Sequence, residues 1–377
     1  MEFALTEEQL ELKAMVKDFV DKEIVPYTEE MDRDNHARPE IFEKAGEMGM
    51  LNLVVPEEYG GPGLDSITVA MIYEELGKGC AGVATSIAAN ALASYPILIA
   101  GNDEQKKYQC DLLNAGKLAA FALTEPGAGS DAGAVSTKAV KEGDHYILNG
   151  SKVFITNGGI ADSVLVFANT RKSGGIRGLT CFIVPTNTPG FSVGRKENKI
   201  GIRPSNTCEL ILEDVVVPES MRVGREGQGF KIAMKTLDSA RPFVASVAVG
   251  LAESCLEIAA KYARERRQFG QPIASFQMVQ AMIADMAMKV EAAKLLVYQA
   301  CWMRDQGMEF GKEAAMSKCY ASDVAMQVAT DALQVMGGYG YMKDYPMEKK
   351  MRDAKILQIY EGTNQIQRMV IANKILY

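Results

Sequence analysis

The sequence of residues 146–156 is YILNGSKVFIT, in which β-branched and aromatic residues flank an Asn-Gly pair. Asn-Gly is typical of a two-residue turn between antiparallel strands. We therefore predict two strands joined by a turn at Asn149 and Gly150. Short apolar segments separated by glycine and proline continue on both sides, as in a compact antiparallel barrel or sandwich. The further predicted strands are residues 119–124, 135–140, 163–168, 179–184, 191–193 and 209–217.

Before and after these strands, apolar residues recur with the spacing of amphipathic helices. The predicted helices are residues 6–27, 39–50, 66–79, 82–100 and 103–114, then 229–266, 276–306, 311–337 and 347–358. The last four are long enough to form a bundle. We therefore expect a mainly α protein with a β insert. Its parts would be an N-terminal helical domain (1–120), a middle β-domain (121–227) and a C-terminal four-helix bundle (228–377).

The composition is that of a soluble protein with more than one domain. The chain has 377 residues, of which 47% are hydrophobic and 24% charged, and its net charge is −7. This acidic balance argues against nucleic acid as a partner. No apolar run reaches the roughly 18 residues of a membrane span, and the N-terminus, MEFALTEE, resembles no signal or transit peptide. A cytoplasmic protein is therefore expected.

Cysteine and histidine usage narrows the chemistry. The seven cysteines form no C-x-x-C pair, which favours free thiols over disulfides or a zinc site. The only two histidines are His36 and His145, and both lie in polar, turn-like sequence. A Ser-His-Asp hydrolase and a histidine metal site are therefore not expected.

One carboxylate near the C-terminus lies in an apolar setting, since residues 359–365 are IYEGTNQ. Burial raises the pKa of a carboxyl group, and Gly362 allows another molecule to approach the backbone closely. Glu361 could therefore be a general base in a dry pocket. Taken alone, however, these seven residues favour a solvated helix end capped by Gly362.

Four further segments are compatible with ligand contacts as well as with ordinary structure. Residues 121–132, FALTEPGAGSDA, match G-x-G-x-x-A, but a strand-like segment follows, which argues against a Rossmann turn. Asp238 and Arg241 form either an intrahelical pair or a ligand-positioning cluster. The arginines of residues 264–267 could bind phosphate or end a helix. The adjacent Gly337 and Gly338 exceed what a helix cap needs. A fifth segment, residues 154–156, ends a strand with a hydroxyl and is a weak candidate.

In order and spacing over essentially the whole chain, these segments together resemble the acyl-CoA dehydrogenase family of FAD-dependent flavoproteins, and most nearly its short-chain, butyryl-type branch. The resemblance implies the three-domain subunit described above, with FAD between the β-domain and the bundle. It also implies an acyl-CoA substrate, electron-transferring flavoprotein as the electron acceptor, and a homotetramer.

The resemblance assigns the role of catalytic base to Glu361, which would remove the α-proton while a β-hydride passes to N5 of FAD. The thioester carbonyl would be hydrogen-bonded by the Gly362 N–H and the ribityl 2′-OH of FAD. Some relatives place the base directly before the arginine of an Asp-x-x-Arg element. Here that position is Ala240, which cannot act as a base.

The resemblance also implies ligand contacts in every segment above. Those implied for FAD are Phe121, Leu123, Thr124, Gly129, Ser130, Phe154, Ile155, Thr156, Arg266, Phe269, Gln277, Gln334, Val335, Gly337, Gly338, Thr363, Asn364 and Gln365. Those implied for the acyl-CoA are Ser130, Asp238, Arg241, Tyr360 and Gly362. No metal ligand is implied.

Two departures from the family pattern bear on the substrate. Residues 238–244 are DSARPFV, where many short-chain members have Asp-Gly-Gly-Arg before small apolar residues, and residues 88–95 are atypical of the pocket floor. A short-chain acyl group is expected, with functionalised and cyclic groups left open. Three alternatives also stay open: an enoyl-CoA reductase running in reverse with electron-transferring flavoprotein, an oxidase that uses O₂, and a non-catalytic helical assembly subunit.

Overall fold

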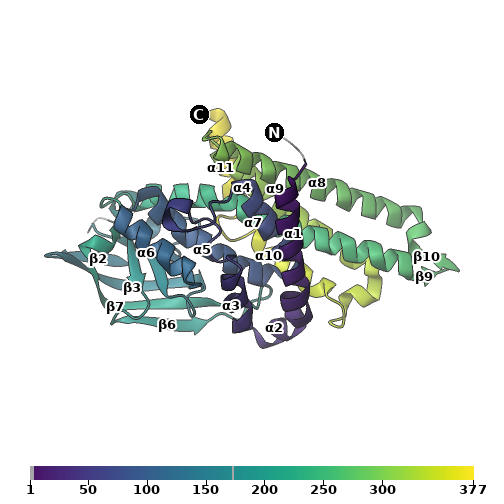
Figure 1. Ribbon diagram of the computed structural model, residues 1–377, viewed down its shortest axis with the longest axis horizontal. Coiled ribbons are helices and arrows are strands. Elements are labelled where there is room, and N and C mark those ends of the chain that lie inside the picture. The colour runs from purple at the N-terminus through teal and green to yellow at the C-terminus, as the bar shows by residue number, and fades with distance from the viewer. Residues whose placement is uncertain (1–3, 172–173) are drawn as a thin grey trace.

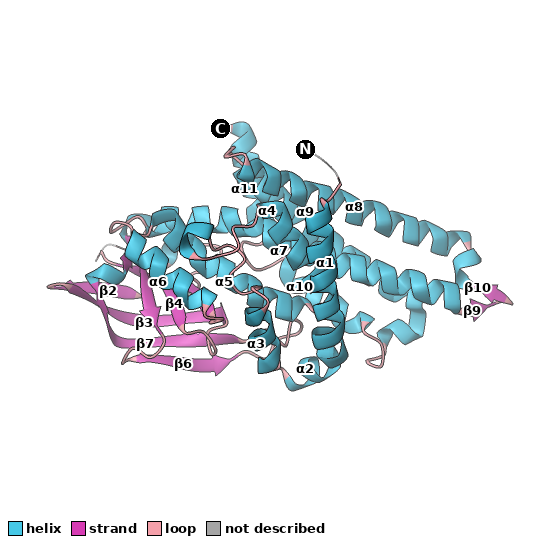
Figure 2. Cartoon of the chain, viewed as in Figure 1, coloured by secondary structure: helices cyan, strands magenta, loops and turns pink. Residues whose placement is uncertain are grey.

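The computed structural model describes residues 4–171 and 174–377. Along the chain a helical part is followed by strands and then by long helices (Figure 1). Figure 2 shows the main sheet at one end of the molecule and the small β9–β10 hairpin at the opposite end. The N-terminal helices are α1 (Glu7–Phe19), α2 (Thr28–Asp34), α3 (Pro39–Glu47), α4 (Ser66–Gly79), α5 (Ala81–Ala100) and α6 (Asp103–Asn114).

The predicted helix at 6–27 is shorter than expected. Thr6 caps α1 as the sequence suggests, accepting from the Gln9 backbone N–H at 3.2 Å. After Phe19, however, the backbone passes through a π turn and then a 3₁₀ turn that contains Pro26. Proline has no N–H to donate, so regular α-helix cannot continue through this position.

The middle strands form one sheet in the order β6-β7-β3-β2-β4-β5-β8, with β1 parallel to β4. A single residue pair joins β2 to β4, so the sheet consists of two nearly separate halves. Both halves contribute side chains to one core, including Leu148 of β3, Val166 of β4 and Leu210 of β7. The strands are β1 (Ala119–Ala122), β2 (Lys138–Glu142), β3 (His145–Thr156), β4 (Ser163–Asn169), β5 (Leu179–Pro185), β6 (Phe191–Lys196), β7 (Thr207–Pro218) and β8 (Arg222–Val223).

The predicted turn at Asn149 and Gly150 is wrong, because β3 runs through both residues. The pairing of β3 with β7 instead shifts register between Leu148 and Gly150, which marks a bulge. A Cβ at Gly150 would lie 2.6 Å from the Thr137 hydroxyl, so glycine is needed for close approach. The Asn149 amide spans the bulge to Asp214 at 2.9 Å. The hairpin turn lies earlier, between β2 and β3.

The C-terminal part contains the four predicted helices and one more. They are α7 (Gly229–Glu265), α8 (Gln277–Asp305), α9 (Gly311–Met336), α10 (Met347–Leu357) and the unpredicted α11 (Asn364–Leu376); β9 (Arg267–Gln268) and β10 (Gln271–Pro272) separate α7 from α8. The expectation that no apolar run could span a membrane was wrong. By length and composition α5 and α7 could do so, but 78% and 72% of their apolar windows are buried within the fold.

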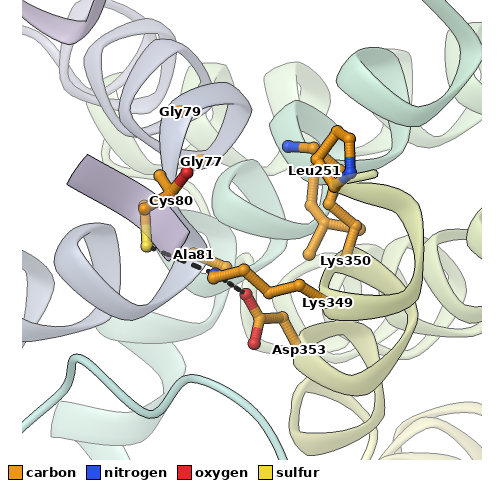
Figure 3. A pocket seen from close by; sticks show the side chains of 10 residues that line it. Gly77, Gly79, Cys80, Ala81, Leu251, Lys349, Lys350 and Asp353 are labelled. Atoms are coloured by element: carbon orange, nitrogen blue, oxygen red, sulfur yellow. Dashed lines mark hydrogen bonds and ion pairs between the residues drawn. The ribbon is translucent and has the colours of Figure 1, made fainter. Parts of the chain in front are cut away.

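Helix α10, which leads to the Glu361 turn, is fixed by buried polar contacts (Figure 3). Lys349 lies 2.5 Å from Asp353 and 3.6 Å from the Cys80 thiol at the start of α5. Asp353 also accepts from the Ile202 backbone N–H at 2.5 Å. The small cavity beside these groups has a volume of about 20 Å³, enough for roughly one water molecule. Helix α10 is therefore held against both the N-terminal helices and the β-domain.

Candidate active site

The Glu361 turn joins α10 to α11 in an unusual backbone conformation. Glu361 has φ +52° and Gly362 has φ +93°. A left-handed conformation at a residue other than glycine costs about 1–2 kcal/mol. The surroundings hold the turn in place, because Gln367 Nε2 donates to the carbonyls of Glu361 at 3.1 Å and Gly362 at 3.0 Å. Lys318 Nζ donates to the Gly362 carbonyl as well, at 2.8 Å.

The Glu361 carboxylate has the properties of a general base. The residue is half-buried, and its Oε2 atom is enclosed without a hydrogen-bond partner among the described residues. Burial raises the pKa of the carboxyl group to about 7, and the nearby charges of Lys318 and Arg241 limit the rise. A carboxylate with this proton affinity can take a proton near neutral pH. A solvated helix end, the interpretation that the seven residues alone favoured, does not describe this environment.

Aromatic side chains from three helices lie beside this carboxylate. The ring of Phe243 on α7 lies 5.6 Å from Tyr73 on α4 and 6.4 Å from Tyr95 on α5. Burial, with the charge of Glu361 as a further cause, raises the pKa of both phenols. The Arg304 guanidinium covers Tyr95 and Phe243, at 4.9 and 5.4 Å from their ring centres. We call Tyr73, Tyr95 and Phe243 the aromatic wall.

Asp238 and Arg241 form the intrahelical pair that the sequence left open, with 2.5 Å between Oδ1 and Nη1. Arg241 is buried, and its Nε has no partner among the described residues. Burial lowers the pKa of Arg241 and raises that of Asp238. The pair lies near Glu361, since both Arg241 and Glu361 influence each other's pKa. A contact of either residue with CoA stays a prediction.

The 121–130 loop lies next to the end of β3. The Val153 N–H donates to the Thr124 carbonyl at 3.0 Å, which joins the two segments. Buried Glu125 anchors the loop through Lys152 at 2.7 Å and the Ser136 hydroxyl at 2.6 Å. Thr124 is half-buried, whereas Gly129 and Ser130 are exposed. The loop is therefore a fixed polar edge rather than a mobile connection.

Phe154 is the most unusual residue at this edge. Its side chain is 64% exposed and its φ is +59°, an uncommon conformation for an aromatic residue. Thr156 is half-buried nearby, and Phe121 packs on Phe167 with ring centres 5.0 Å apart. An exposed aromatic ring on strained backbone is a common feature of ligand sites.

Four of the predicted cofactor contacts have buried side chains. Those of Leu123, Ile155 and Val335 belong to hydrophobic cores, with exposures of 7%, 2% and 7%. Asn364 is buried and binds the Ser322 hydroxyl at 2.8 Å and Asp323 at 2.7 Å. Their side chains are therefore occupied by the fold, and only their backbone groups are available for a ligand. The sequence could not separate these residues from exposed neighbours in the same segments.

The remaining predicted contacts differ in position. Thr363 caps α11 by accepting from the Ile366 N–H at 3.3 Å, whereas Gln365 is exposed. Tyr360 is half-buried, and its hydroxyl lies 3.3 Å from that of Thr85. Another group lies around the β9–β10 hairpin, at the opposite end of the molecule from the main sheet (Figure 1). Its exposed members are Arg266, Phe269, Gln277, Gln334, Gly337 and Gly338.

This distant group also has strained, open positions. Phe269 is 92% exposed with φ +51°, and Gly337 has φ +61°. The Arg266 guanidinium stacks 5.2 Å above the Tyr339 ring. A single chain does not bring this group near Glu361.

Three residues of the site were missed from the sequence: Tyr73 and Lys318, whose pKa values the charge of Glu361 affects, and Arg304, which covers the aromatic wall. Lys318 did carry a signal, because it lies three and four positions after the buried Ala315 and Ala314 on α9. A lysine on the buried face of a helix needs a specific partner. The other two had no such signal, since their place in the site depends on how separate helices pack.

Comparisons with known proteins identify the family. The chain matches three family models: "Acyl-CoA dehydrogenase, N-terminal domain" at residues 6–117, "Acyl-CoA dehydrogenase, middle domain" at 120–215 and "Acyl-CoA dehydrogenase, C-terminal domain" at 227–376. The chain belongs to the acyl-CoA dehydrogenase family. It is therefore an oxidoreductase, and members of this family are flavoproteins.

Relatives of this acyl-CoA dehydrogenase match over its full length. It is 47% identical to an acyl-CoA dehydrogenase of Bacillus subtilis (99% of each chain). It is 45% identical to a short-chain-specific acyl-CoA dehydrogenase of Clostridium acetobutylicum (100% of each). It is 46% identical to an acryloyl-CoA reductase (NADH) of Anaerotignum propionicum, covering 100% of this chain and 96% of the other.

Solved structures agree with the predicted fold. The butyryl-CoA dehydrogenase of Megasphaera elsdenii superposes with a TM-score of 0.98 at 45% identity. A chain of the structure described as "Electron transferring flavoprotein of Acidaminococcus fermentans: Towards a mechanism of flavin-based electron bifurcation" gives a TM-score of 0.97 at 49% identity. Both matches cover 100% of each chain. The acyl-CoA dehydrogenase fold and the resemblance to the short-chain branch are confirmed.

Proposed function

We propose that this acyl-CoA dehydrogenase removes the α-proton of a short-chain acyl-CoA with Glu361 and yields the trans-2-enoyl-CoA. The observation that carries the proposal is the enclosed, unpartnered Glu361 carboxylate, whose pKa burial raises to about 7. Electrons would pass to electron-transferring flavoprotein. The three-domain division at 1–120, 121–227 and 228–377 and a cytoplasmic location are part of the same proposal.

The turn also supplies a donor for the thioester. The Gly362 N–H has no acceptor among the described residues. We propose that it donates to the thioester carbonyl, which would stabilise negative charge on that oxygen and acidify the α-proton. Glu361 would then hold this proton on its carboxylate. The burial of the carboxylate favours the transfer, because a desolvated base binds a proton more strongly.

The residues around Phe154 fit a planar cofactor such as FAD. The exposed Phe154 ring offers an apolar face, and no atom lies within 4 Å of a Cβ built on Gly127 or Gly129. Thr124, Ser130 and Thr156 offer hydroxyls along the same edge. FAD, when bound, supplies the two-electron acceptor of the reaction. We propose that the exposed group around Phe269 holds the pyrophosphate and adenosine end of a cofactor in a neighbouring subunit of a homotetramer.

The aromatic wall supports a short acyl group. Tyr73, Tyr95 and Phe243 are 1–2% exposed, so their rings are packed and leave little freedom to move aside for a long chain. A four-carbon chain suits this wall better than an eight-carbon chain.

The reverse reaction is the second candidate, because two of the relatives are named as reductases. The acryloyl-CoA reductase (NADH) of A. propionicum is 46% identical and a 3-(aryl)acrylate reductase of Clostridium sporogenes is 45% identical, about the same as the dehydrogenases. Enoyl-CoA reduction would use the same residues, with protonated Glu361 returning the α-proton. Co-purification of electron-transferring flavoprotein and NADH-driven reduction of enoyl-CoA would favour this direction.

One experiment tests cofactor, substrate and base together. Bleaching of the bound flavin would be followed with C4, C6, C8, branched and cyclic acyl-CoAs, with Glu361→Gln as the control. We expect the highest kcat/KM for a short chain and no bleaching in the variant. An optimum at C8 or longer would contradict the substrate, and wild-type bleaching by Glu361→Gln would contradict the base.

Two outcomes would instead favour an oxidase or a non-catalytic subunit. Hydrogen peroxide formed in step with product would indicate an oxidase. A purified protein without flavin absorbance, even after incubation with FAD, would indicate a non-catalytic subunit and refute the proposal.

A further inference from the structure

Lys318 is a buried cation that the proposed chemistry does not yet use. Its side chain is 0% exposed, and its Nζ donates to the Gly362 carbonyl at 2.8 Å and to Asn364 Oδ1 at 3.0 Å. No described carboxylate lies within the 4.0 Å of an ion pair. Burying a charge without a partner is costly. The position of Lys318 therefore requires an explanation beyond packing.

The site that Lys318 contacts is the Glu361 turn. Lys318 and Gln367 both donate to the Gly362 carbonyl, and Gln367 also donates to the Glu361 carbonyl. In a trans peptide the C=O and N–H point in opposite directions. Fixing the Glu361 carbonyl on Gln367 therefore directs the Gly362 N–H away from α11. Lys318 fixes the next peptide group, so the two donors together determine the orientation of this turn.

The acceptor of Lys318, Asn364 at the start of α11, is itself anchored to other residues of α9. Asn364, which accepts from Lys318, donates to the Ser322 hydroxyl at 2.8 Å, to Asp323 at 2.7 Å and to the Cys319 carbonyl at 3.2 Å. This network leaves the lysine ammonium little freedom to turn away from Gly362.

We propose that Lys318 is a positioning residue for Glu361, which fixes the Gly362 carbonyl and supplies the positive charge that keeps the Glu361 carboxylate ionised before substrate binds. The inference rests on the proposed role of Glu361. It adds an electrostatic function that no motif of the chain indicated.

The charges around Glu361 support this role. Its charged neighbours are Lys318 from α9 and Arg241 from α7, and its own charge contributes to raising the pKa of the phenols of Tyr73, Tyr95 and Tyr360. Arg241 is already paired with Asp238 at 2.5 Å. Lys318 is therefore the cation near Glu361 that forms no ion pair with another carboxylate in the described part of the chain.

The groups around Lys318 lead to the same conclusion. They are Glu361, the Cys319 thiol, Arg241 and Asp323, and Asp323 is paired with Arg368 at 2.7 Å. Burial lowers the pKa of Lys318 to about 8, and the charge of Glu361 opposes this shift. Between about pH 7 and 8 each group is therefore at least half ionised. Removing the cation must raise the pKa of Glu361, because an ionised carboxylate loses its favourable neighbour.

Two substitutions separate the charge from the hydrogen bond. Lys318→Gln removes the charge but can still donate to the Gly362 carbonyl, whereas Lys318→Met removes both. Ser322→Ala is the matched control, since it removes the hydrogen bonds of the Ser322 hydroxyl to Asn364 and to the Lys318 and Cys319 carbonyls but no charge. Each holoenzyme would be titrated by infrared spectroscopy. The C=O stretch of protonated Glu361 is assigned by its loss in Glu361→Gln.

We expect both Lys318 variants to raise the pH at which this band has half its full intensity by at least about one unit. Ser322→Ala should leave this titration midpoint unchanged. The acid limb of kcat/KM for butyryl-CoA should shift by the same amount, which lowers kcat/KM about fivefold at pH 7 and about tenfold well below pH 7. At pH 9 Lys318→Gln should recover more activity than Lys318→Met, because it retains a donor. If Lys318→Met does not fold, the glutamine variant, similar in size, carries the test.

An unchanged midpoint in Lys318→Gln would overturn the inference, as would an equal shift in Ser322→Ala. Failure of the proposed base has a different signature. In that case the infrared midpoint would still move in the Lys318 variants, but the acid limb of kcat/KM would stay in place.

Discussion

At the scale of single residues, the site combines strain with burial. Glu361 occupies a left-handed conformation and also holds an enclosed carboxylate oxygen. Each feature costs free energy of folding. Residues kept in such states point to function, because a neutral or smaller side chain would be more stable there.

This cost can be measured as a pH-dependent stability. The pKa of Glu361 is raised to about 7 from an ordinary value of 4.5, so the folded state binds the proton more tightly than the unfolded state. The carboxylate therefore destabilises the fold increasingly as pH rises from about 4.5 to 7. We expect Glu361→Gln to increase the free energy of unfolding by about 1–3 kcal/mol at pH 8, and therefore to raise the Tm, but to have a much smaller effect at pH 5. Thermal unfolding of both holoenzymes would show this, and an equal effect at both pH values would contradict it.

At the scale of elements, helices were predicted well both with and without a capping side chain. Helices α7, α8 and α9 have no side-chain cap, yet their bounds lie within one residue of the prediction. Helix α4 begins after Asp65, whose side chain accepts from the Thr68 N–H at 2.6 Å, and α6 begins after Asn102 in the same way, so both had the expected bounds. The Asn149-Gly150 pair misled because a turn and a bulge demand the same residues. Helix α11 was not predicted, although the Thr363 side chain caps its start by accepting from the Ile366 N–H. The preceding Glu361-Gly362 turn was interpreted as the end of a helix and not as a link to another one.

The aromatic wall is a property of several elements and is tested at that scale. Phe243 of α7 contacts Tyr73 of α4 and Tyr95 of α5, so no single segment specifies the wall. We expect Phe243→Val to open space beside Glu361 and to move the preferred acyl chain from C4 toward C6 or C8. The kcat/KM ratio of octanoyl-CoA to butyryl-CoA should rise about tenfold, because one or two more methylenes would be accommodated.

The loss of the ring should also destabilise the protein by about 3 kcal/mol or less, as for a large-to-small core substitution. Leu112, half-buried on α6 and packed against a different hydrophobic core from the one that contains the wall, provides a control as Leu112→Val. An unchanged chain-length preference in Phe243→Val would mean that the wall does not bound the acyl pocket.

At the scale of the whole molecule, most predicted cofactor contacts fall into two groups that lie apart, and Thr363, Asn364 and Gln365 lie separately beside Glu361. Phe154 and Thr124 lie at the edge of the β-domain, whereas Phe269 and Arg266 lie by the β9–β10 hairpin (Figure 1). The sequence indicated both groups but not their separation, which depends on the length of α7 and α8. If one cofactor contacts both groups, as we propose, the group at the β9–β10 hairpin would come from a neighbouring subunit.

This arrangement predicts complementation between two inactive variants. Glu361→Gln should lack the base, and Phe269→Asp combined with Arg266→Glu should lack the donated cofactor contacts. Each homogeneous protein should be inactive. Co-expression should restore activity, because about a quarter of the sites in randomly mixed tetramers would combine an intact Glu361 with an intact neighbour. Tandem affinity tags would isolate the mixed tetramers for assay. Mixed tetramers without activity, although they bind FAD, would show that each subunit builds its cofactor site alone.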